Sequence, residues 1–433
     1  MGYASLDYVD LKYRPTEEDL VCEYYLEPGE GRTLANAAEA LAAESSIGTW
    51  THIATLKPGT ARKLKPHIYE INARAKTVKI AYNADLFEAG SIPQIWSAIA
   101  GNVFGMKAAD NLRLLDVELP SSILRAYKGP ALGIPGIRKM LNVSKRPLIG
   151  TIVKPKVGLS AKEHAQVAYE AWAGGLDLVK DDENLTSMKY NKFEDRLAAT
   201  LEAKDLAEQE TGEKKIYVCN VTAETMEMLR RAQLIKDQGG NCAMIDIITA
   251  GWAAVQSLRE ANTGLILHGH RAMHAAITRN RRHGISMLVF AKFARLAGID
   301  ELHIGAIYGK MEGTKKEVLT MEHEIEDRII KPDERTHVLA EKWLHIKPTF
   351  AIASGGLHPG VLDKLVHAMG NDCICQAGGG VHGHEKGTRV GATAMRQALE
   401  ATMKNIPLTK YAQTHPELNQ ALRQWGTKPT GGE

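Results

Sequence analysis

The pattern of apolar and polar positions changes near residue 128, and beyond it short β-branched and aliphatic runs recur along the chain. Each run is followed by turn residues and then by a segment with the apolar spacing of a helix. Strands that alternate with helices favour right-handed crossovers and a parallel sheet. Eight such units match a (β/α)8 barrel, although a doubly wound sheet has the same local pattern. The eight runs are 147–154, 176–180, 216–220, 243–247, 265–270, 301–305, 349–354 and 373–380.

The predicted helices between these runs begin and end at recognisable signals. Ser160 and Glu163 form a capping box ahead of a helical segment, and Gly174 with Gly175 ends it. The segment 193–210 has the same spacing and also ends before a glycine. These signals support the alternation of strand and helix.

Residues before about 128 predict a separate small domain with strands and helices in a different order. The predicted fold class is therefore α/β, with a C-terminal (β/α)8 TIM barrel at 129–433 and a smaller N-terminal α+β domain at 1–128. The stretch 125–139, rich in glycine and proline, is the predicted junction. The predicted N-terminal elements are strands at 21–27, 51–56, 67–72 and 77–83 and helices at 35–45 and 92–105.

Charge and cysteine usage exclude several classes of protein. The formal net charge is only +3 and comes from intermixed acids and bases, which argues against nucleic-acid and membrane-surface partners. The five cysteines include no CxxC pair, as is typical of reduced intracellular thiols. No segment reaches the roughly 18 apolar residues of a membrane span, and the first residues lack a signal-peptide core. We therefore expect a cytoplasmic protein with no membrane contact and no nucleic-acid partner.

The residues at the carboxyl ends of the predicted strands are candidate site residues, because the reactive groups of (β/α)8 barrels lie there. Each of them alone has an ordinary explanation, such as a helix cap, a half-buried histidine or a turn glycine. Their concentration on one rim favours a functional site. The candidates are Lys154, Lys156, Lys180, Asp182, Glu183, Asn220, Asp246, His268, His270, Arg271, His303, Ser354, Gly355, Gly356, Gly378, Gly379 and Gly380.

Lys180 is followed directly by three acids, Asp181, Asp182 and Glu183. One interpretation is a solvated turn after a strand. The other is a site for a hard divalent cation such as Mg²⁺, because clustered carboxylate oxygens bind such a cation and lose their mutual repulsion. Zinc is disfavoured despite the histidines at 268–270, because no cysteine lies at ligand spacing.

Other candidates indicate a substrate with a phosphate at each end. The glycine-rich stretches 354–356 and 378–380 lie at the ends of the seventh and eighth runs, where the backbone N–H groups of barrels often form a phosphate site. Arg271 with His270 supplies charge-assisted hydrogen bonds for a second phosphate on the far side. Lys310 lies in a glycine-flanked loop able to close over a bound substrate.

With these residues in view, the chain resembles the large chain of ribulose-1,5-bisphosphate carboxylase/oxygenase, RuBisCO, over essentially its whole length. The amino-acid residues of several motifs are most similar to those of the archaeal, form III branch. The motifs are ESSIGTWT (44–51), GNVFG (101–105), GTIVKPKVGLS (150–160), GGLDLVKDDEN (174–184), HRAMHAA (270–276), LHIGAIYGKMEG (302–313), SGGLHPG (354–360) and QAGGGVHGH (376–384).

The resemblance implies that Lys180 reacts with an activating CO₂ to become a carbamate, which binds Mg²⁺ together with Asp182 and Glu183. Asp181 matches a position that is not a ligand. Lys154 and Lys156, which the charge pattern already suggests for proton transfer, resemble the pair that assists enolisation and protonates the product. The other implied residues are the active-site histidines His270 and His303, the phosphate ligand Arg271, the loop lysine Lys310, and the sugar and phosphate contacts Ser354, Gly355, Gly378 and Gly379.

The resemblance also implies that four N-terminal residues, Glu44, Thr49, Trp50 and Asn102, complete the active site of a neighbouring subunit. The smallest competent unit is then a homodimer, alone or as part of an assembly of dimers. A small subunit is not expected by family analogy, and the short C-terminus after the last helix lacks the latch of plant relatives.

The implied reaction adds CO₂ and water to ribulose 1,5-bisphosphate through a metal-bound enediolate and yields two 3-phosphoglycerates, with O₂ as a competing substrate. The pentose is expected from archaeal nucleotide (AMP) salvage or a related carbon-fixing route. Ala306 and Tyr308 depart from many relatives, which puts loop closure and gas selectivity in doubt. Two alternatives are a RuBisCO-like enolase or isomerase without carboxylation and a non-catalytic phosphosugar-binding protein.

Overall fold

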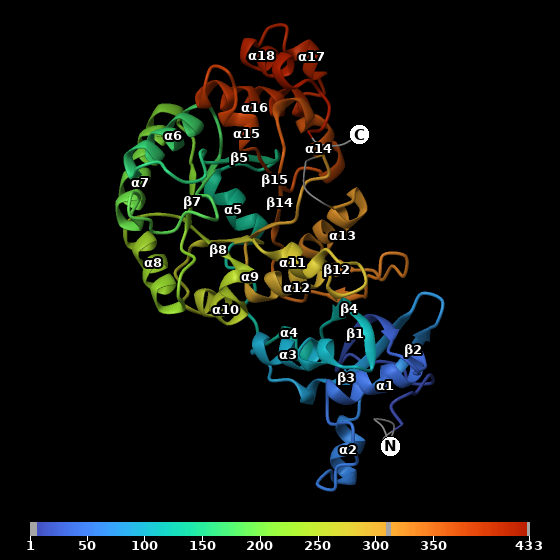
Figure 1. Ribbon diagram of the computed structural model, residues 1–433. Helices are drawn as coiled ribbons and strands as arrows, with labels where there is room; N and C mark the ends of the chain where they lie inside the picture. Colours follow the sequence, from blue (N-terminus) through green and yellow to red (C-terminus); the bar gives the residue numbers. More distant parts are fainter. Residues whose placement is uncertain (1–6, 309–312, 431–433) are drawn as a thin grey trace. The chain divides into compact units, whose positions relative to one another are not determined.

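The computed structural model of the chain describes residues 7–308 and 313–430 (Figure 1). It divides the chain into two compact units that interleave along the sequence. The first unit comprises Met1–Gly129, Met273–Ala297 and Asp327–Ile346, and the second comprises Pro130–Ala272, Gly298–Glu326 and Lys347–Glu433. The division into domains at 1–128 and 129–433 stays a prediction.

The second unit is built on a closed barrel of eight parallel strands in chain order, which confirms the predicted fold class. Closure between the last strand and the first, where Ile374 pairs with Leu148, excludes the doubly wound alternative. Each predicted run coincides with one strand. The strands are β5 (Leu148–Ile152), β6 (Leu178–Lys180), β7 (Ile216–Asn220), β8 (Cys242–Asp246), β9 (Ile266–His270), β11 (Glu301–His303), β14 (Phe350–Ser354) and β15 (Cys373–Gln376).

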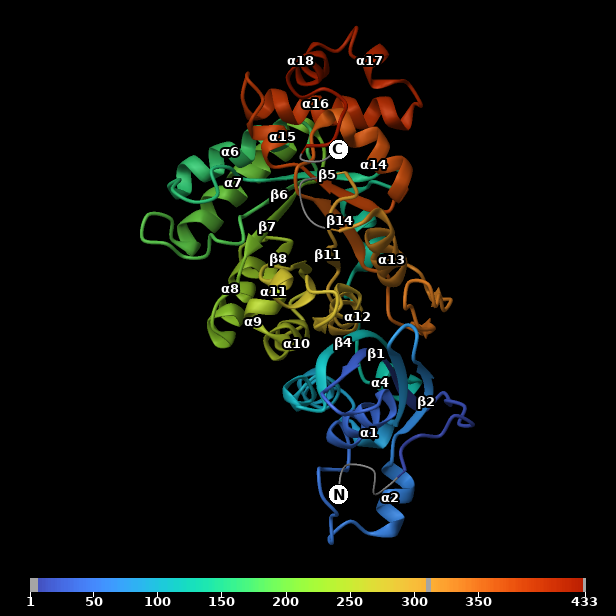
Figure 2. The ribbon, with the colours of Figure 1, turned by 45° about the vertical axis from the view of Figure 1, so that its right-hand side comes forward.

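Helices surround this barrel, and Figures 1 and 2 show α6, α7 and α8 along the outside of β6, β7 and β8. The predicted capping box is present, because the Ser160 side chain accepts from the Glu163 N–H and Glu163 accepts from the Ser160 backbone. The helices of the second unit are α5 (Gly133–Leu141), α6 (Ala161–Ala173), α7 (Phe193–Thr211), α8 (Thr225–Asp237), α9 (Ile247–Ala250), α10 (Trp252–Glu260), α13 (Lys315–Glu326), η4 (Pro359–Val361), α14 (Leu362–Met369), α15 (Gly379–His382), α16 (Thr388–Met403), α17 (Leu408–Tyr411) and α18 (Pro416–Trp425).

Alternate residues of the barrel strands face the interior, where they form one apolar cluster that includes Leu178, Ile266 and Ile374. Two residues further along the same strands the pleat returns to the interior, and the side chains become polar at Lys180, His268 and Gln376. The barrel therefore changes from apolar to polar toward the carboxyl ends of its strands.

The first unit contains a five-stranded sheet of order β10-β4-β1-β3-β2, in which β10 is parallel to β4 and the other pairs are antiparallel. Its strands are β1 (Asp19–Pro28), β2 (His67–Asn72), β3 (Thr77–Asn83), β4 (Ala109–Glu118) and β10 (Gly284–Ile285), with a separate pair β12 (Ile329–Ile330) and β13 (Glu341–Lys342). The helices are α1 (Leu34–Glu44), α2 (Pro58–Leu64), η2 (Ala84–Leu86), α3 (Ile92–Ile99), η3 (Asn102–Gly105), α4 (Ser121–Leu124), α11 (His274–Thr278) and α12 (Met287–Ala297).

Three N-terminal predictions need correction. The segment 51–56 is not a strand: it is largely exposed, and no strand pairs with it. The helix predicted at 92–105 ends at Ile99, because Gly101 leaves the helical conformation with ψ of −114°, and a 3-10 turn follows. A Cβ at this position would lie 2.1 Å from the Ser97 carbonyl oxygen, so the turn requires glycine. Strand β4 was not predicted, because its acids and asparagine interrupt the apolar alternation.

Strand β4 carries a fully buried acid, Asp116, whose carboxylate lies 2.9 Å from the ammonium of Lys292 on α12. The same lysine donates to the Val117 carbonyl at 2.8 Å, and the Asp116 carboxylate accepts from the Leu339 N–H at 2.7 Å. These bonds explain why two later segments of the chain pack with the N-terminal sheet.

Among the described residues, no helix is long and apolar enough to cross a membrane.

At the amino-terminal rim of the barrel, Arg146 binds the buried Asp177 through two hydrogen bonds of 2.7 Å. Burial opposes ionisation of Asp177, but its bonds and charge contacts with Arg146 outweigh this and lower the pKa. We expect Arg146→Met to destabilise the fold by about 3 kcal/mol at neutral pH, because it removes the bidentate partner of a buried carboxylate and leaves it with Arg396, 3.7 Å away, and the Ile149 N–H. Denaturant unfolding of wild type and variant measures the difference.

The matched control is Arg230→Met, which breaks an exposed pair with Glu227 and Glu194 and should cost much less. Because the pKa of Asp177 is lowered in the fold, its contribution is present above the unfolded pKa and is lost as the pH falls. The Arg146→Met difference should therefore shrink below about pH 4. Equal effects of the two variants would contradict this assignment.

Candidate active site

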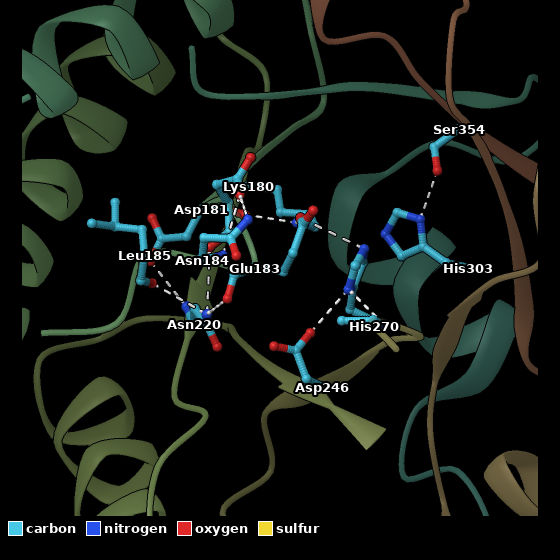
Figure 3. Close-up of polar contacts among 12 residues, drawn as sticks. Lys180, Asp181, Glu183, Asn184, Leu185, Asn220, Asp246, His270, His303 and Ser354 are labelled. Carbon is cyan, nitrogen blue, oxygen red and sulfur yellow. Dashed lines mark hydrogen bonds and ion pairs between the residues drawn. The ribbon is translucent and has the colours of Figure 1, made fainter. Parts of the chain in front are cut away.

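Lys180 is the last residue of strand β6, and its side chain has no solvent exposure. Its ammonium donates to the Asp181 carbonyl at 2.8 Å and lies 3.4 Å from Glu183 Oε2 (Figure 3). Burial lowers the pKa of Lys180 below its usual value, although the charges of Glu183, Asp182 and Asp246 oppose the shift. A larger share of this amine is therefore neutral and nucleophilic than for an exposed lysine.

Asp181 turns away from the other two acids and into the protein. Its carboxylate accepts from Arg196 Nε at 3.1 Å, from the Tyr217 hydroxyl at 2.8 Å and from the Asn220 N–H at 2.9 Å, and it lies 3.1 Å from His164 Nε2. Burial opposes ionisation, but Arg196 and His164 lower the pKa of Asp181. All of its lone pairs are engaged, so this acid anchors the strand end.

Asp182 and Glu183 provide the carboxylates nearest to Lys180. Asp182 Oδ2 accepts from Lys154 Nζ at 2.8 Å, and its Oδ1 accepts from the Asn184 side chain at 3.0 Å. Burial alone would raise the pKa of Glu183, but the charges of Lys180 and His270 outweigh burial and lower the pKa to about 2. Glu183 is thus ionised, and both carboxylates have a lysine ammonium beside them.

Two carboxylates beside an oxygen-rich strand end fit a hard cation such as Mg²⁺. Among the described residues, no three His, Cys, Asp or Glu side chains gather in the way a complete metal site requires. A cation held by Asp182 and Glu183 would take its further oxygen ligands from water or from another group. Lys180 Nζ lies 3.4 Å from Glu183 Oε2, beside these carboxylates.

The histidines extend the cluster across the ends of β8, β9, β11 and β14 (Figure 3). His270 Nδ1 lies 2.9 Å from Asp246 Oδ1, and the His270 ring meets the His303 ring edge to face at 4.8 Å. His303 Nδ1 lies 2.8 Å from the Ser354 hydroxyl. Burial holds the pKa of His303 well below its usual value, so the ring is neutral.

Arg271 and several glycines form the remaining part of the rim. Burial lowers the pKa of Arg271 to about 10, so the guanidinium stays charged at neutral pH. A Cβ at Gly305, where φ is +102°, would lie 2.7 Å from Arg271 Nη2, so only glycine leaves room for this side chain. A Cβ at Gly378 would lie 3.2 Å from Lys154 Cε, which shows that the last strand's loop lies against that lysine. Gly355 and Gly356 have φ of +108° and +90°.

Some predicted residues are not part of this cluster. Lys156 is exposed in the loop after β5, and Gly379 begins α15. Lys310 lies outside the described residues. The four residues predicted to act in a neighbouring subunit belong to the first unit, where α1 and η3 contact each other. These are Glu44 at the end of α1, the half-buried Thr49, the exposed Trp50 and the exposed Asn102 at the start of η3.

Several side chains bonded to the cluster had no role assigned from the sequence. Asp246 binds His270, and Asn184 binds Asp182. His268 binds His303 through a contact of 2.8 Å between their Nε2 atoms, and Glu301 binds His268. The sequence contains a signal for these contacts. His268 and His270 are two positions apart on one strand, and so are Glu301 and His303 on another, so each pair shares the inner face of its strand.

A closed parallel barrel that gathers lysine, carboxylate and histidine side chains at the carboxyl ends of its strands defines an enzyme of the (β/α)8 class. Two family descriptions match the chain: "Ribulose bisphosphate carboxylase large chain, catalytic domain" over residues 133–425, and "Ribulose bisphosphate carboxylase large chain, N-terminal domain" over residues 7–123. The chain therefore belongs to the RuBisCO large-chain family.

Its relatives are archaeal. The ribulose bisphosphate carboxylase of Methanosarcina barkeri is 53% identical over 422 residues, which cover 97% of this chain and 99% of that protein. The corresponding protein of Methanocaldococcus jannaschii is 50% identical over 427 residues, which cover 97% and 100%. The solved structure "Dimeric Archeal Rubisco from Hyperthermus butylicus" has a TM-score of 0.93 at 46% identity and covers 98% of this chain and 99% of its own. The predicted family, its archaeal type and the enzyme class, ribulose bisphosphate carboxylase, are confirmed.

The adjacent acids Asp181 and Asp182 should respond differently to the same substitution. Asp181→Asn leaves the buried Arg196 without an anionic partner and should lower the free energy of unfolding by about 3 kcal/mol. Asp182→Asn should cost clearly less, because its partner Lys154 is 29% exposed and can turn to solvent. Denaturant unfolding of the two variants tests this, and an equal loss in both would show that Asp181 is not the structural acid.

Proposed function

We propose that the chain carboxylates ribulose 1,5-bisphosphate after Lys180 takes up an activating CO₂ as a carbamate, and that the carbamate holds Mg²⁺ together with Asp182 and Glu183. The observation that carries the proposal is the fully buried Lys180 amine, 3.4 Å from Glu183 Oε2 and next to a carboxylate already paired with Lys154. Attack of the neutral amine on CO₂ forms an N–C bond and releases one proton. The product is an anion with two oxygens, one of which completes the ligand set that the described acids lack.

Bound Mg²⁺ would polarise the substrate carbonyl and hydroxyl oxygens and so make the C3 proton more acidic. Lys154 is 29% exposed and bonded to Asp182 Oδ2, so it would be free to turn toward the substrate if that oxygen bound the metal instead. Lys154 and Lys156 are the proposed proton-transfer groups, and Lys310 is proposed to stabilise the developing carboxylate from its loop.

The substrate is proposed to lie across the rim with its phosphates at opposite ends. Gly378 lies beside Lys154 and Gly379 begins α15, and their backbone N–H groups are proposed to bind one phosphate, while the buried guanidinium of Arg271 is proposed to bind the other. His270, His303, Ser354, Gly355 and Gly356 lie in between and are proposed to contact the sugar hydroxyls and the nearer phosphate. O₂ is proposed to compete with CO₂ for the same enediolate carbon.

The assembly is proposed to be a homodimer or a set of dimers, without a small subunit, in which the first unit of one protomer supplies Glu44, Thr49, Trp50 and Asn102 to its partner's barrel. The titles of two solved relatives support this, since one is called dimeric and another, from Pyrococcus horikoshii, is called octameric. The second has a TM-score of 0.91 at 45% identity and covers 98% of this chain and 97% of its own. We further propose that the pentose bisphosphate comes from AMP salvage or a related carbon-fixing route.

Lys180→Met should abolish carbamate formation and carboxylation without unfolding the barrel. Incubation with ¹³C-bicarbonate and Mg²⁺, followed by ¹³C NMR, should show a carbamate resonance in the wild type and none in the variant. The matched control is Lys215→Met, which removes another fully buried lysine with a carboxylate partner and a burial-lowered pKa, located just before β7 at the opposite rim. A resonance that persists in Lys180→Met would sink the assignment.

Mixing two inactive variants tests the shared site. Glu44→Gln and Lys180→Met each disable a different half of every site, so each homodimer should be inactive. After dissociation and random reassociation, half of the dimers are hybrids with one intact site, so about a quarter of the wild-type activity should return. Mixing without dissociation is the control, and a mixture that stays inactive after proven subunit exchange would place Glu44 in its own barrel's site.

A further inference from the structure

A continuous chain of hydrogen bonds crosses the barrel interior beneath the site. Glu301 Oε1 lies 2.7 Å from His268 Nδ1, His268 Nε2 lies 2.8 Å from His303 Nε2, and His303 Nδ1 lies 2.8 Å from the Ser354 hydroxyl. The members come from three strands, β9, β11 and β14. Glu301 and His268 have no solvent exposure, His303 is buried, and Ser354 is half-buried, so the chain leads from the barrel core to the rim.

The inner end of this chain depends on one contact. Among the described side chains, Glu301 Oε2 has no hydrogen-bond partner, and the only other neighbour of Oε1 is the Cys242 thiol at 3.8 Å. The His268 ring is therefore the strong polar contact of this buried carboxylate. A histidine whose ring N–H is donated to a carboxylate is fixed in one tautomer and one orientation.

The proton positions follow from counting. Burial lowers the pKa of both His268 and His303, so each neutral ring carries one N–H. With Glu301 Oε1 as the acceptor of the first bond, the His268 proton lies on Nδ1 and its Nε2 accepts. His303 must then carry its proton on Nε2, which leaves its Nδ1 to accept from the Ser354 hydroxyl. Each bond has one proton, and all three donors point toward Glu301.

We infer that His268 and Glu301 are positioning residues of the site: they hold His303 with its proton on Nε2, so that the Ser354 hydroxyl donates inward and presents its oxygen as an acceptor to a substrate hydroxyl. A proton placed on Glu301 would reverse all three bonds and turn Ser354 into a donor toward the substrate. The acceptor oxygen of Glu301 therefore sets the direction of the chain, and with it the partner that the rim serine selects. This inference rests on the proposed function, in which Ser354 contacts a sugar hydroxyl.

The test compares substitutions that separate polarity from packing. Glu301→Met keeps the approximate size of the side chain but removes the acceptor. It should raise the Kd for ribulose 1,5-bisphosphate about tenfold, which is the change expected for the loss of about one hydrogen bond. Glu301→Gln keeps an acceptor oxygen and should stay within about threefold of the wild type. A packing role predicts the opposite order. Because Glu301→Met leaves the His268 N–H buried and unpaired, the double variant His268→Phe with Glu301→Met removes that N–H and leaves His303 without the partner that fixes its tautomer.

Calorimetric titration of ribulose 1,5-bisphosphate in Mg²⁺ gives each Kd, and Ser354→Ala completes a double-mutant cycle. In the Ser354→Ala background, Glu301→Met should change the Kd less than about twofold, because the chain no longer ends on a hydroxyl. The control Cys242→Ala, which alters packing beside Glu301 but leaves the chain intact, should also stay within about twofold. A full tenfold loss in both backgrounds, or a Glu301→Met variant and double variant that bind like the wild type, would overturn the inference.

A separate carboxylation assay on the wild type keeps the two proposals distinguishable. Labelled CO₂ that appears in 3-phosphoglycerate supports the proposed function whatever the cycle shows. If no label is incorporated while the Kd values follow the chain as described, the proposed reaction falls and the role of His268 and Glu301 in substrate binding stands.

Discussion

An amine held without solvent among carboxylates is the constraint on which the site depends. Lys180 has no exposure, and among the described residues its Nζ contacts the Asp181 carbonyl and Glu183. A buried ammonium is costly, whereas a neutral amine leaves Asp182 with Lys154 and Glu183 with His270 as partners. In the proposed function, a carbamate on this amine and a divalent cation would together balance both acids. Burial favours the neutral amine, which is the form that the proposed modification requires.

That arrangement is rigid because the neighbouring acid is used for structure. Asp181 is tied to Arg196, Tyr217 and Asn220, which come from α7 and from β7. These bonds fix the peptide after Lys180, and with it the directions in which the side chains on either side of Asp181 leave the strand. Two adjacent acids with the same chemistry therefore have opposite roles, because successive side chains at a strand end point to opposite sides.

Much of the barrel could be predicted from sequence, because parallel strands buried on both faces appear as continuous apolar runs. Strand β4 could not, since its buried Asp116 is compensated by Lys292, a residue 176 positions away. The segment 51–56 alternates like a strand but has no partner. Strand ends identified the site's lysines and acids, whereas the pairing of His268 with Glu301 depends on the register between β9 and β11, which local sequence does not contain.

The change from apolar to polar side chains inside the barrel explains how one fold serves stability and chemistry. Leu178, Ile266 and Ile374 belong to the apolar cluster, and burial of such side chains stabilises the fold by about 2 kcal/mol each. Two residues further on, the interior carries Lys180 and His268, which are tolerated only because each has a fixed partner. Polar groups that must be paired have few alternative positions. The stability supplied by the apolar part of the barrel therefore supports a polar part in which proton positions, and not only atom positions, are determined.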